Sequence, residues 1–372
     1  MALLALFFII FFNVMSKQSY CNSPKLHPKI VKTKQLKKIF IITRHGSRSP
    51  MIENNLKLTC NKTQNCKINE LTDYGKAQMM KLGSELKEYL SSNHFDLNES
   101  KSVFKSTRTD RTIKSAESFL KGLFANNFQN YTENILKNIL SENTNKFSLH
   151  LTKNDVIEEK QRERFRFIES TMAPFISNLA EKFAKVYKEN FSTDETDKNE
   201  KKTKTELLID MFDLLQIAEC NNLEFLKSKN ESFSNNDFEI LWTFMDYVAS
   251  QIVDPEIADL ATKPLRNEIS HFLNPEIEIK KSEEECVGGM CNNLRSKNFE
   301  FVSGHDDTLY PLMVFFKQNF IELPSLASYL MLEMFDENGS QSVRVSYNSR
   351  ELKICQPLKT FCPLNEFLEW IK

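Results

Sequence analysis

The sequence predicts an α/β protein with a mostly parallel central sheet flanked by helices, and an inserted, mainly α-helical second domain. Three observations support this. Short apolar, β-branched segments at 38–43 and 102–107 read as buried strands, and each is followed by a polar turn and a helical pattern. The third observation is that residues 126–275 show almost no pattern typical of strands. The predicted units are an α/β domain of residues 30–125 and 296–372, and a helical insert of residues 126–295.

The overall composition fits an ordinary globular protein of one large or two smaller domains. The chain has 372 residues, of which 41% are hydrophobic and 27% charged. The formal net charge of −1 gives no electrostatic reason to expect nucleic acid or an anionic membrane as a partner. We therefore expect no nucleic acid partner.

The first residues indicate the secretory route. Residues 2–12 form an apolar run that is too short to span a bilayer but suits the core of a signal peptide, predicted as residues 1–16. A signal anchor is the alternative. Six acceptor sequons for N-glycosylation agree with this route, at Asn61, Asn98, Asn130, Asn190, Asn230 and Asn338. We expect a secreted protein or one of the lysosomal or vacuolar lumen, with no stable membrane anchor.

Eight cysteines remain after cleavage behind Ser16, an even number that suits an oxidising compartment. Their close spacing predicts the local pairs Cys60–Cys66, Cys286–Cys291 and Cys355–Cys362. The pairing of Cys21 and Cys220 is left open. Neither Cys-x-x-Cys nor paired-histidine spacing occurs, so we expect no metal.

The first strand, 38–43, leads directly into Arg44-His45-Gly46-Ser47-Arg48-Ser49-Pro50. Ligands bind at the carboxyl ends of strands in open α/β sheets. Two guanidiniums four residues apart can clamp an anion, and His45 between them is a candidate nucleophile or base. A surface cluster of Arg and His after a core strand is the alternative. Five residues typical of functional sites within a stretch of seven, placed directly after a strand, favour a catalytic or binding site instead.

A helix is predicted from about residue 72 to Leu90, with Thr72 as its N-cap. Its predicted apolar face contains Ala77, Met80, Leu86 and Leu90. The strand 102–107 then runs into Arg108-Thr109-Asp110-Arg111 and a further helix, which places Arg111 near a helix N-terminus that favours anions. An exposed first-turn arginine is the alternative.

Four amphipathic helices are predicted in the insert, over residues 162–188, 205–226, 237–253 and 260–272. Phe167, Phe175, Leu179, Phe183 and Val186 form the apolar stripe of the first, which we interpret as core.

The last part of the chain repeats the pattern of the first. The strand 299–303 ends in Gly304-His305-Asp306-Asp307, so a histidine again follows a strand, now with two carboxylates. A final hairpin is predicted from residues 327–335 and 342–347, around an Asn-Gly turn.

These strand ends can converge at one edge of the sheet. Several arginines demand a multiply charged anion, for which phosphate is the obvious candidate. Phosphoryl transfer needs charge stabilisation, an in-line nucleophile and an acid for the leaving oxygen. Arginines, one imidazole and either Asp306 or Asp307 supply these groups. The sequence has no cysteine followed six residues later by arginine, no nucleotide P-loop and no Gly-x-Ser-x-Gly elbow.

The motifs together resemble the histidine acid phosphatase family, of the lysosomal and prostatic type. The resemblance rests on Arg44-His45-Gly46-x-Arg48-x-Pro50, Ser106-Thr107-x-x-Asp110-Arg111-Thr112, His305-Asp306, Leu71-Thr72-x-x-Gly75-x-x-Gln78 and Cys355…Cys362-Pro363-Leu364-x-x-Phe367. It implies that His45 is the nucleophile, oriented by the Gly46 carbonyl, and that Asp306 is the proton donor. It also implies that Arg44, Arg48, Arg111 and His305 bind the phosphoryl group, without a cofactor.

Two departures from the family pattern bear on the site. Asp307 stands where the family usually has an uncharged residue, so the choice of Asp306 over Asp307 depends on the resemblance alone. Lys105 replaces the arginine usual before Ser-Thr, and we expect this change at the pocket rim.

The resemblance implies an acid phosphatase of broad specificity that hydrolyses phosphate monoesters through a phosphohistidine intermediate. A narrower phosphatase, for inositol phosphates or lysophosphatidic acid, is the first alternative. A phosphomutase or a non-catalytic phosphate-binding protein are others. The expected partner is a small phosphomonoester, and the oligomeric state is left open, with a homodimer as one option.

Overall fold

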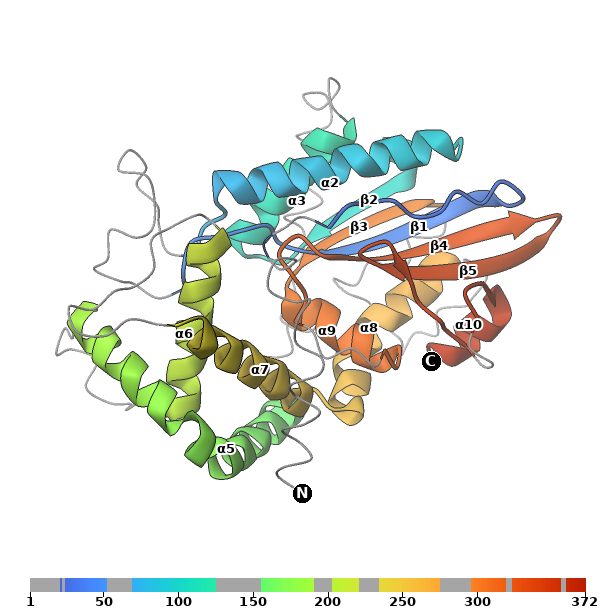
Figure 1. Ribbon diagram of the computed structural model, residues 1–372. Helices are drawn as coiled ribbons and strands as arrows, with labels where there is room; N and C mark the ends of the chain where they lie inside the picture. The colour runs from blue at the N-terminus through green and yellow to red at the C-terminus, as the bar shows by residue number, and fades with distance from the viewer. Residues whose placement is uncertain are drawn as a thin grey trace.

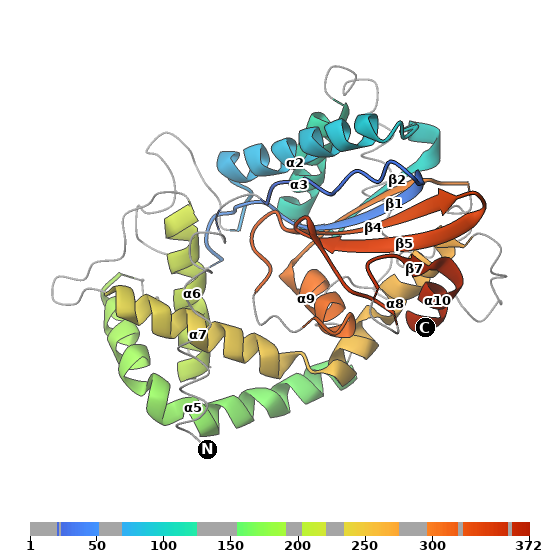
Figure 2. The same cartoon turned by 45° about the vertical axis from the view of Figure 1, so that its right-hand side comes forward.

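A layered α/β unit and a group of helices beside it form the computed structural model, which describes residues 21, 24–51, 69–124, 155–190, 203–220, 234–274, 296–318, 323–355 and 359–372. Helices α2 and α3 cover one face of the sheet, and α8, α9 and α10 cover the other (Figure 1). The bounds of these five are Asp73–Ser92, Asp110–Phe124, Pro255–Leu273, Asp306–Phe315 and Leu364–Trp370. The remaining long helices, α5 (Asp155–Asn190), α6 (Lys204–Cys220) and α7 (Asn235–Ile252), lie together at one side (Figures 1 and 2).

The sheet is mixed, with strand order β2-β3-β1-β4-β5-β6 and β7 paired to β5. The strands are β1 (Gln35–Arg44), β2 (Ser102–Ser106), β3 (Phe299–Gly304), β4 (Tyr329–Glu337), β5 (Ser340–Tyr347), β6 (Arg350–Glu351) and β7 (Cys362–Pro363). The pairs β2/β3 and β3/β1 are parallel, whereas β4 runs antiparallel to β1 and β5. The α/β class is thus confirmed, but parallel pairing is limited to three strands because the predicted hairpin adds antiparallel strands at β1.

Strand β1 is buried on both faces, which explains its continuous apolar run. Ile39 and Ile41 pack into the core beneath α2 and α3. Phe40 and Ile42 point the other way, into the core shared with α8, α9 and α10. The alternation of side chains along a strand divides these four residues between the two cores.

Helix α2 begins where the sequence predicts, because Thr72 is its N-cap and accepts a hydrogen bond from the Gly75 N–H. The predicted apolar face is partly wrong. Ala77 is exposed and Met80 is 42% exposed, whereas Leu86 and Leu90 are buried as predicted and share the buried stripe with Met79 and Leu82. Helix α3 packs closely on this stripe.

The insert helices lie close to their predicted ranges and share a core of their own. Leu179 and Phe183 of α5 are buried in it, together with residues of α6 and α7. Phe167 and Phe175, predicted in the same stripe, are 48% and 43% exposed.

Helix α8 packs against both groups, since Ile257 and Ala258 in its first turns share a core with Ile157 of α5, while its later turns lie against the sheet. The sequence prediction places it in the insert, but Leu265, Ile269 and Phe272 lie in the core beneath β1 and β3. Its apolar period is the same as that of the insert helices, so the sequence pattern could not separate them.

A buried ionic cluster lies on this side of the sheet. Lys105 of β2 forms ion pairs with Glu268 of α8 and, at 3.0 Å, with Glu300 of β3. All three side chains are buried. The expectation that Lys105 modifies the pocket rim is therefore wrong, because its ammonium group points into the interior. We call Lys105, Glu268 and Glu300 the interior cluster.

Two disulfides occur in the described parts of the chain. Cys355–Cys362 confirms a predicted pair, and Cys21 bonds to Cys220, a pairing that the sequence left open. The other two predicted pairs lie outside the described residues. These disulfides agree with an extracellular or luminal protein.

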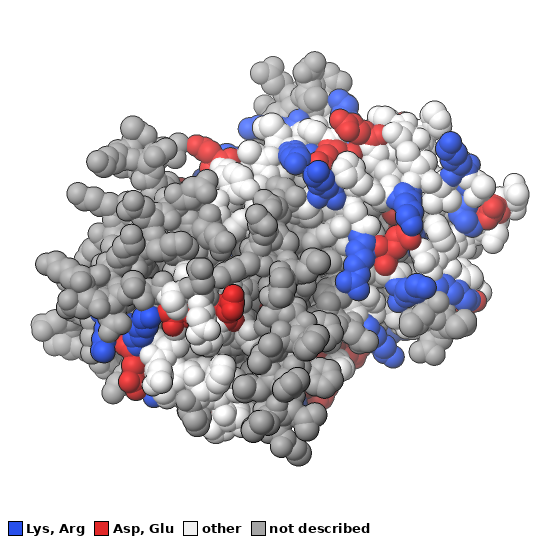
Figure 3. Space-filling model, viewed as in Figure 1, with Lys and Arg blue, Asp and Glu red and all other residues white. Residues whose placement is uncertain are grey.

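Among the described residues visible in Figure 3, Lys and Arg alternate with Asp and Glu and neither sign forms a continuous patch. Within the described ranges, no helix is both long and apolar enough to cross a membrane.

Candidate active site

Three strand ends meet at one edge of the sheet, as the sequence predicts. In the parallel register, Arg44 of β1 lies opposite Gly304 of β3, and Ser106 of β2 lies opposite Ser303. The residues that follow are joined across the strands, since the His45 N–H donates to the Gly304 carbonyl at 3.0 Å. The rings of His45 and His305 consequently lie edge to face, 5.6 Å apart.

The loop after β1 is fixed against the start of α2. A Cβ atom on Gly46 would lie 2.3 Å from the Gly75 carbonyl oxygen, so the two backbones approach as only glycine allows. The Ser47 N–H donates to Gln78 Oε1 at 2.8 Å, and the Thr72 N–H donates to the Ser47 carbonyl at 2.9 Å. Residues 71–78, which belong to the same family resemblance as the His45 motif, therefore hold the loop of that motif in place.

The environment of His45 keeps its ring neutral and sets its tautomer. Nδ1 lies 2.8 Å from the Gly46 carbonyl oxygen, which can only accept, so Nδ1 carries the proton. Burial lowers the pKa of His45 well below its usual value, and the positive charges of Arg44, Arg111 and Arg48 lower it further. The neutral ring therefore holds its lone pair on Nε2, as a nucleophile requires.

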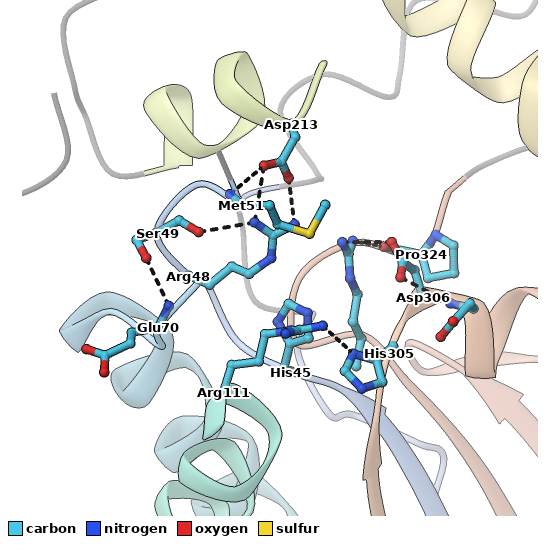
Figure 4. A network of polar contacts seen from close by, with 12 residues as sticks. His45, Arg48, Ser49, Met51, Glu70, Arg111, Asp213, His305, Asp306 and Pro324 are labelled. Atoms are coloured by element: carbon cyan, nitrogen blue, oxygen red, sulfur yellow. Dashed lines mark hydrogen bonds and ion pairs between the residues drawn. The ribbon is translucent and has the colours of Figure 1, made fainter. Parts of the chain in front are cut away.

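Arg44 connects β1 to the start of α9. Its Nη2 forms an ion pair with Asp306 Oδ2 at 2.9 Å, and Nη1 donates to the Pro324 carbonyl at 2.5 Å. The Asp306 side chain is 41% exposed, whereas Arg44 is buried. Burial alone would raise the pKa of Asp306, but Arg44 and Arg48 outweigh it and hold that pKa below its usual value. This contact places the Asp306 carboxylate beside the arginines (Figure 4).

Arg48 is held by a residue of the insert. Its Nη2 donates to Asp213 Oδ1 at 2.6 Å, and its Nη1 donates to Asp213 Oδ2 at 3.3 Å and to the Ser49 carbonyl at 3.1 Å. Asp213 lies on α6 and also accepts from the Met51 N–H at 3.1 Å. The loop of the His45 motif and the insert therefore meet at this ion pair (Figure 4).

Arg111 lies in the first turn of α3 and reaches His305. Arg111 Nη2 lies 3.1 Å from His305 Nδ1, and Thr107 Oγ1 lies 2.8 Å from His305 Nε2. Because a guanidinium only donates, Nδ1 accepts, and Nε2 carries the proton that Thr107 receives. Burial, followed by the charge of Arg48, lowers the pKa of Arg111 to about 10.

Residues 35–348 match the model of the histidine phosphatase superfamily (branch 2). This range is most of the chain and contains every predicted site residue. The chain belongs to this superfamily. As a histidine phosphatase it has distant relatives among acid phosphatases. It is 23% identical over 390 residues to a probable acid phosphatase of Dictyostelium discoideum, covering 90% of this chain and 76% of the relative.

Solved structures of histidine phosphatases share the fold. The phytase of Hafnia alvei, in its apo form, superposes with a TM-score of 0.63 and 14% identity, covering 92% of this chain and 97% of the phytase. The multiple inositol polyphosphate phosphatase of Bifidobacterium longum, in complex with inositol hexasulfate, gives a TM-score of 0.63 at 14% identity and covers 96% of both chains. These similarities confirm the α/β fold with a helical insert.

Sequence reasoning names six residues for the site of this histidine phosphatase, and the structure brings all six together: Arg44, His45, Arg48, Arg111, His305 and Asp306. It missed Asp213 and gave no role to Thr107. Thr107 stands in a quoted motif, so its place after β2 was an available signal. Asp213 carries no such signal, because it is one acid among many on a helical insert.

Proposed function

We propose that this histidine phosphatase is an acid phosphatase of broad specificity that hydrolyses phosphate monoesters through a phosphohistidine intermediate. The observation that carries the proposal is the state of His45. Burial and the charges of Arg44, Arg48 and Arg111 lower its pKa and so favour the neutral ring, and the contact of Nδ1 with the Gly46 carbonyl leaves the lone pair on Nε2. A nucleophile surrounded by cations suits an anionic electrophile such as a phosphoryl group.

The proposed reaction has two balanced steps. In the first, His45 Nε2 forms a bond to phosphorus while the ester P–O bond breaks, and Asp306 gives its proton to the leaving oxygen, which departs as an alcohol. In the second, water attacks phosphorus, the P–N bond breaks, and Asp306 takes the proton of the water. Arg44, Arg48, Arg111 and His305 would bind the phosphoryl oxygens and stabilise their charge in both transition states.

Asp306, rather than Asp307, is the proposed proton donor because its carboxylate contacts Arg44 at 2.9 Å. In the free enzyme this contact lowers its pKa. A bound phosphoryl group would take over Arg44 and bring negative charge, so the pKa of Asp306 rises on binding. Acid pH then favours the protonated complex, as an ordinary Asp is protonated only near pH ~4.

A narrower substrate class is the second candidate. The solved relatives include complexes with inositol hexasulfate and with myo-inositol hexakis sulphate, which mimic inositol phosphates. The fold likeness at 14% identity does not extend to substrate preference. A substrate panel of an aryl phosphate, an inositol phosphate and a lysophosphatidic acid, compared by kcat/KM, separates the candidates. Similar values support broad specificity, and a preference for one class supports the narrower activity.

The test of the proposed function is release of inorganic phosphate from an aryl phosphate at about pH 4–5. We expect turnover by the wild-type protein and a loss of roughly 10⁴-fold or more in His45→Ala. Acid-quenching during turnover with labelled substrate should trap a phosphoprotein that is stable in alkali, as a phosphoramidate is. An active His45→Ala variant, or a phosphoprotein in that variant, would exclude the mechanism.

We further propose that the protein works in the secretory pathway or outside the cell. The apolar run at residues 2–12 and the disulfides support this proposal.

A further inference from the structure

We propose that Asp213 of the insert is a positioning residue that directs one edge of the Arg48 guanidinium toward the bound phosphoryl group. This inference depends on the proposed function for the identity of the anion. The other residues of the site lie at or after the ends of β1, β2 and β3, whereas Asp213 lies on helix α6 of the insert.

The hydrogen bonds of Arg48 show which of its donors remain. A guanidinium has five N–H donors. Two on Nη1 are directed to the Ser49 carbonyl and Asp213 Oδ2, and one on Nη2 is directed to Asp213 Oδ1. The Nε–H and the second N–H of Nη2 are left, and these two lie on one edge of the planar group.

This remaining edge fits a phosphoryl group. Within the described residues, Arg48 Nε is buried and has no hydrogen-bond partner. A buried donor without an acceptor costs about 1–3 kcal/mol, so a ligand that supplies the acceptor gains that free energy. Two parallel N–H groups match two oxygens of one phosphoryl group. Asp213 therefore leaves the binding edge open while it occupies the other side.

Asp213 is itself held firmly. Its side chain is mostly buried, and the carboxylate accepts a third hydrogen bond, from the Met51 N–H to Oδ2, at 3.1 Å. Around it, α6 is anchored in the core of the insert by Met211, Phe212 and Leu215. A carboxylate fixed in this way restricts the rotation of a long arginine side chain, which otherwise has several rotatable bonds to order on binding.

A second connection fixes α6 relative to the same loop. Cys220 at the end of α6 is bonded to Cys21, and the Cys21 carbonyl accepts from Gln78 Nε2 at 2.9 Å. Gln78 Oε1 in turn accepts from the Ser47 N–H at 2.8 Å. Helix α6 is thus connected to this loop at two points, at Ser47 through Cys21 and Gln78 and at Arg48 through Asp213, and the two connections together fix the position of Asp213 relative to Arg48.

The experiment compares Asp213→Asn with the wild-type protein by calorimetric binding of inorganic phosphate at acid pH. Asparagine retains the shape but replaces one acceptor oxygen by an NH₂ that opposes the guanidinium. We expect the Kd for inorganic phosphate to rise at least about tenfold. Glu239→Gln, which removes an exposed acid from α7, is the matched control and should change the Kd less than about twofold. An unchanged or lower Kd in Asp213→Asn overturns the proposal.

A double-mutant cycle shows whether Asp213 acts through Arg48. In an Arg48→Gln background, Asp213→Asn should have no further effect on phosphate binding, since the group that it positions is gone. The same tenfold loss in that background would overturn the proposal. Phosphate binding without any turnover of aryl phosphate would instead contradict the proposed function, so the two failures are distinguishable.

A crystal structure of the wild-type protein with inorganic phosphate tests the geometry even if Asp213→Asn does not fold. We expect phosphate oxygens within hydrogen-bond distance of Arg48 Nε and Nη2 while Asp213 keeps its contacts with Nη1 and Nη2. A phosphate that displaces Asp213 from the guanidinium would identify Asp213 as a competitor and overturn the positioning role.

Discussion

Two groups of charged residues lie along the same strands and differ in how far their charges are balanced. At the strand ends, Arg44 forms an ion pair with Asp306 and Arg48 with Asp213, whereas Arg111 forms none with the described residues. In the interior cluster, a single lysine faces two glutamates. The strand ends thus have one guanidinium without an ion pair, and the interior cluster has one more carboxyl group than cations.

The two groups differ in whether protonation can remove the unbalanced charge. In the interior cluster, burial raises the pKa of Glu300 well above its usual value, and the nearby charge of Glu268 raises it further. A proton held by Glu300 balances the cluster. At the strand ends the guanidiniums keep their charge, although burial lowers the pKa of Arg111. A cluster that neutralises itself contributes to stability alone, whereas one that retains unmet charge can bind an anion.

Among variants that keep His45, the largest expected effect is on the proposed proton donor at the strand ends. Asp306→Asn should lower kcat for an alkyl phosphate by about 10²–10⁴-fold, because the amide cannot protonate the leaving oxygen. Its thermal stability should change little, since the side chain is partly exposed. Steady-state kinetics on Asp306→Asn and Asp307→Asn checks this. A larger loss in Asp307→Asn would move the role to Asp307.

The second prediction concerns the stability of the interior cluster. Burial opposes the charge of Lys105, but Glu268 and Glu300 together raise its pKa, so the lysine stays charged. Lys105→Met leaves two buried carboxyl groups without a cation, and we expect the free energy of unfolding to fall by about 3–5 kcal/mol. Urea unfolding measures this. Lys101→Met, which removes an exposed ion pair, should change it by less than about 0.5–1 kcal/mol.

The same two lysine variants also test the separation of the two clusters. The fraction of Lys105→Met that remains folded should turn over aryl phosphate within about threefold of wild type, because the ammonium group of Lys105 forms its ion pairs among the described residues with Glu268 and Glu300 and not with the arginines or histidines at the strand ends. A variant that is fully folded but inactive would show that the interior cluster takes part in the reaction.

A smaller effect is expected at Thr107, which receives the His305 Nε2–H. Thr107→Val removes this acceptor at nearly constant volume and frees the ring of His305 to turn. We expect kcat/KM to fall by about tenfold, as for other residues that orient a ligand-binding histidine. Ser118→Ala removes a hydroxyl that bonds only within α3 and should leave kcat/KM unchanged. Equal losses in both variants would point to a general effect on α3.

The smallest effect is the pH dependence of Glu300. Its folded pKa lies above the unfolded value, so its contribution to stability is full below about pH 4 and declines as the pH rises toward the folded pKa. Glutamine does not ionise. The stability of Glu300→Gln relative to wild type should therefore increase between about pH 4 and pH 7, as measured by urea unfolding at each pH. A difference independent of pH would contradict a protonated Glu300.

Much of the fold and the site could be predicted because the relevant patterns are local. A charged residue or histidine that directly follows a strand lies at the carboxyl edge of the sheet. Parallel strands share that edge, so Arg44 and His305 were expected to lie close together. Which face of a helix is buried was harder to predict. The stripe chosen for α2 contained the exposed Met80, since a helix of moderate amphipathicity has more than one plausible apolar face.

The sequence by itself determined the strand, turn and helix order and the identity of the residues at the strand ends, because these follow from propensity and periodicity within a few residues. Only the tertiary structure decided that Asp213 meets Arg48, 165 residues away, and that Lys105 faces inward. The packing of α8 against the sheet and the Cys21–Cys220 bond were decided in the same way. Such contacts depend on how separate cores pack together, and no local pattern in the chain encodes which helix face will meet which loop.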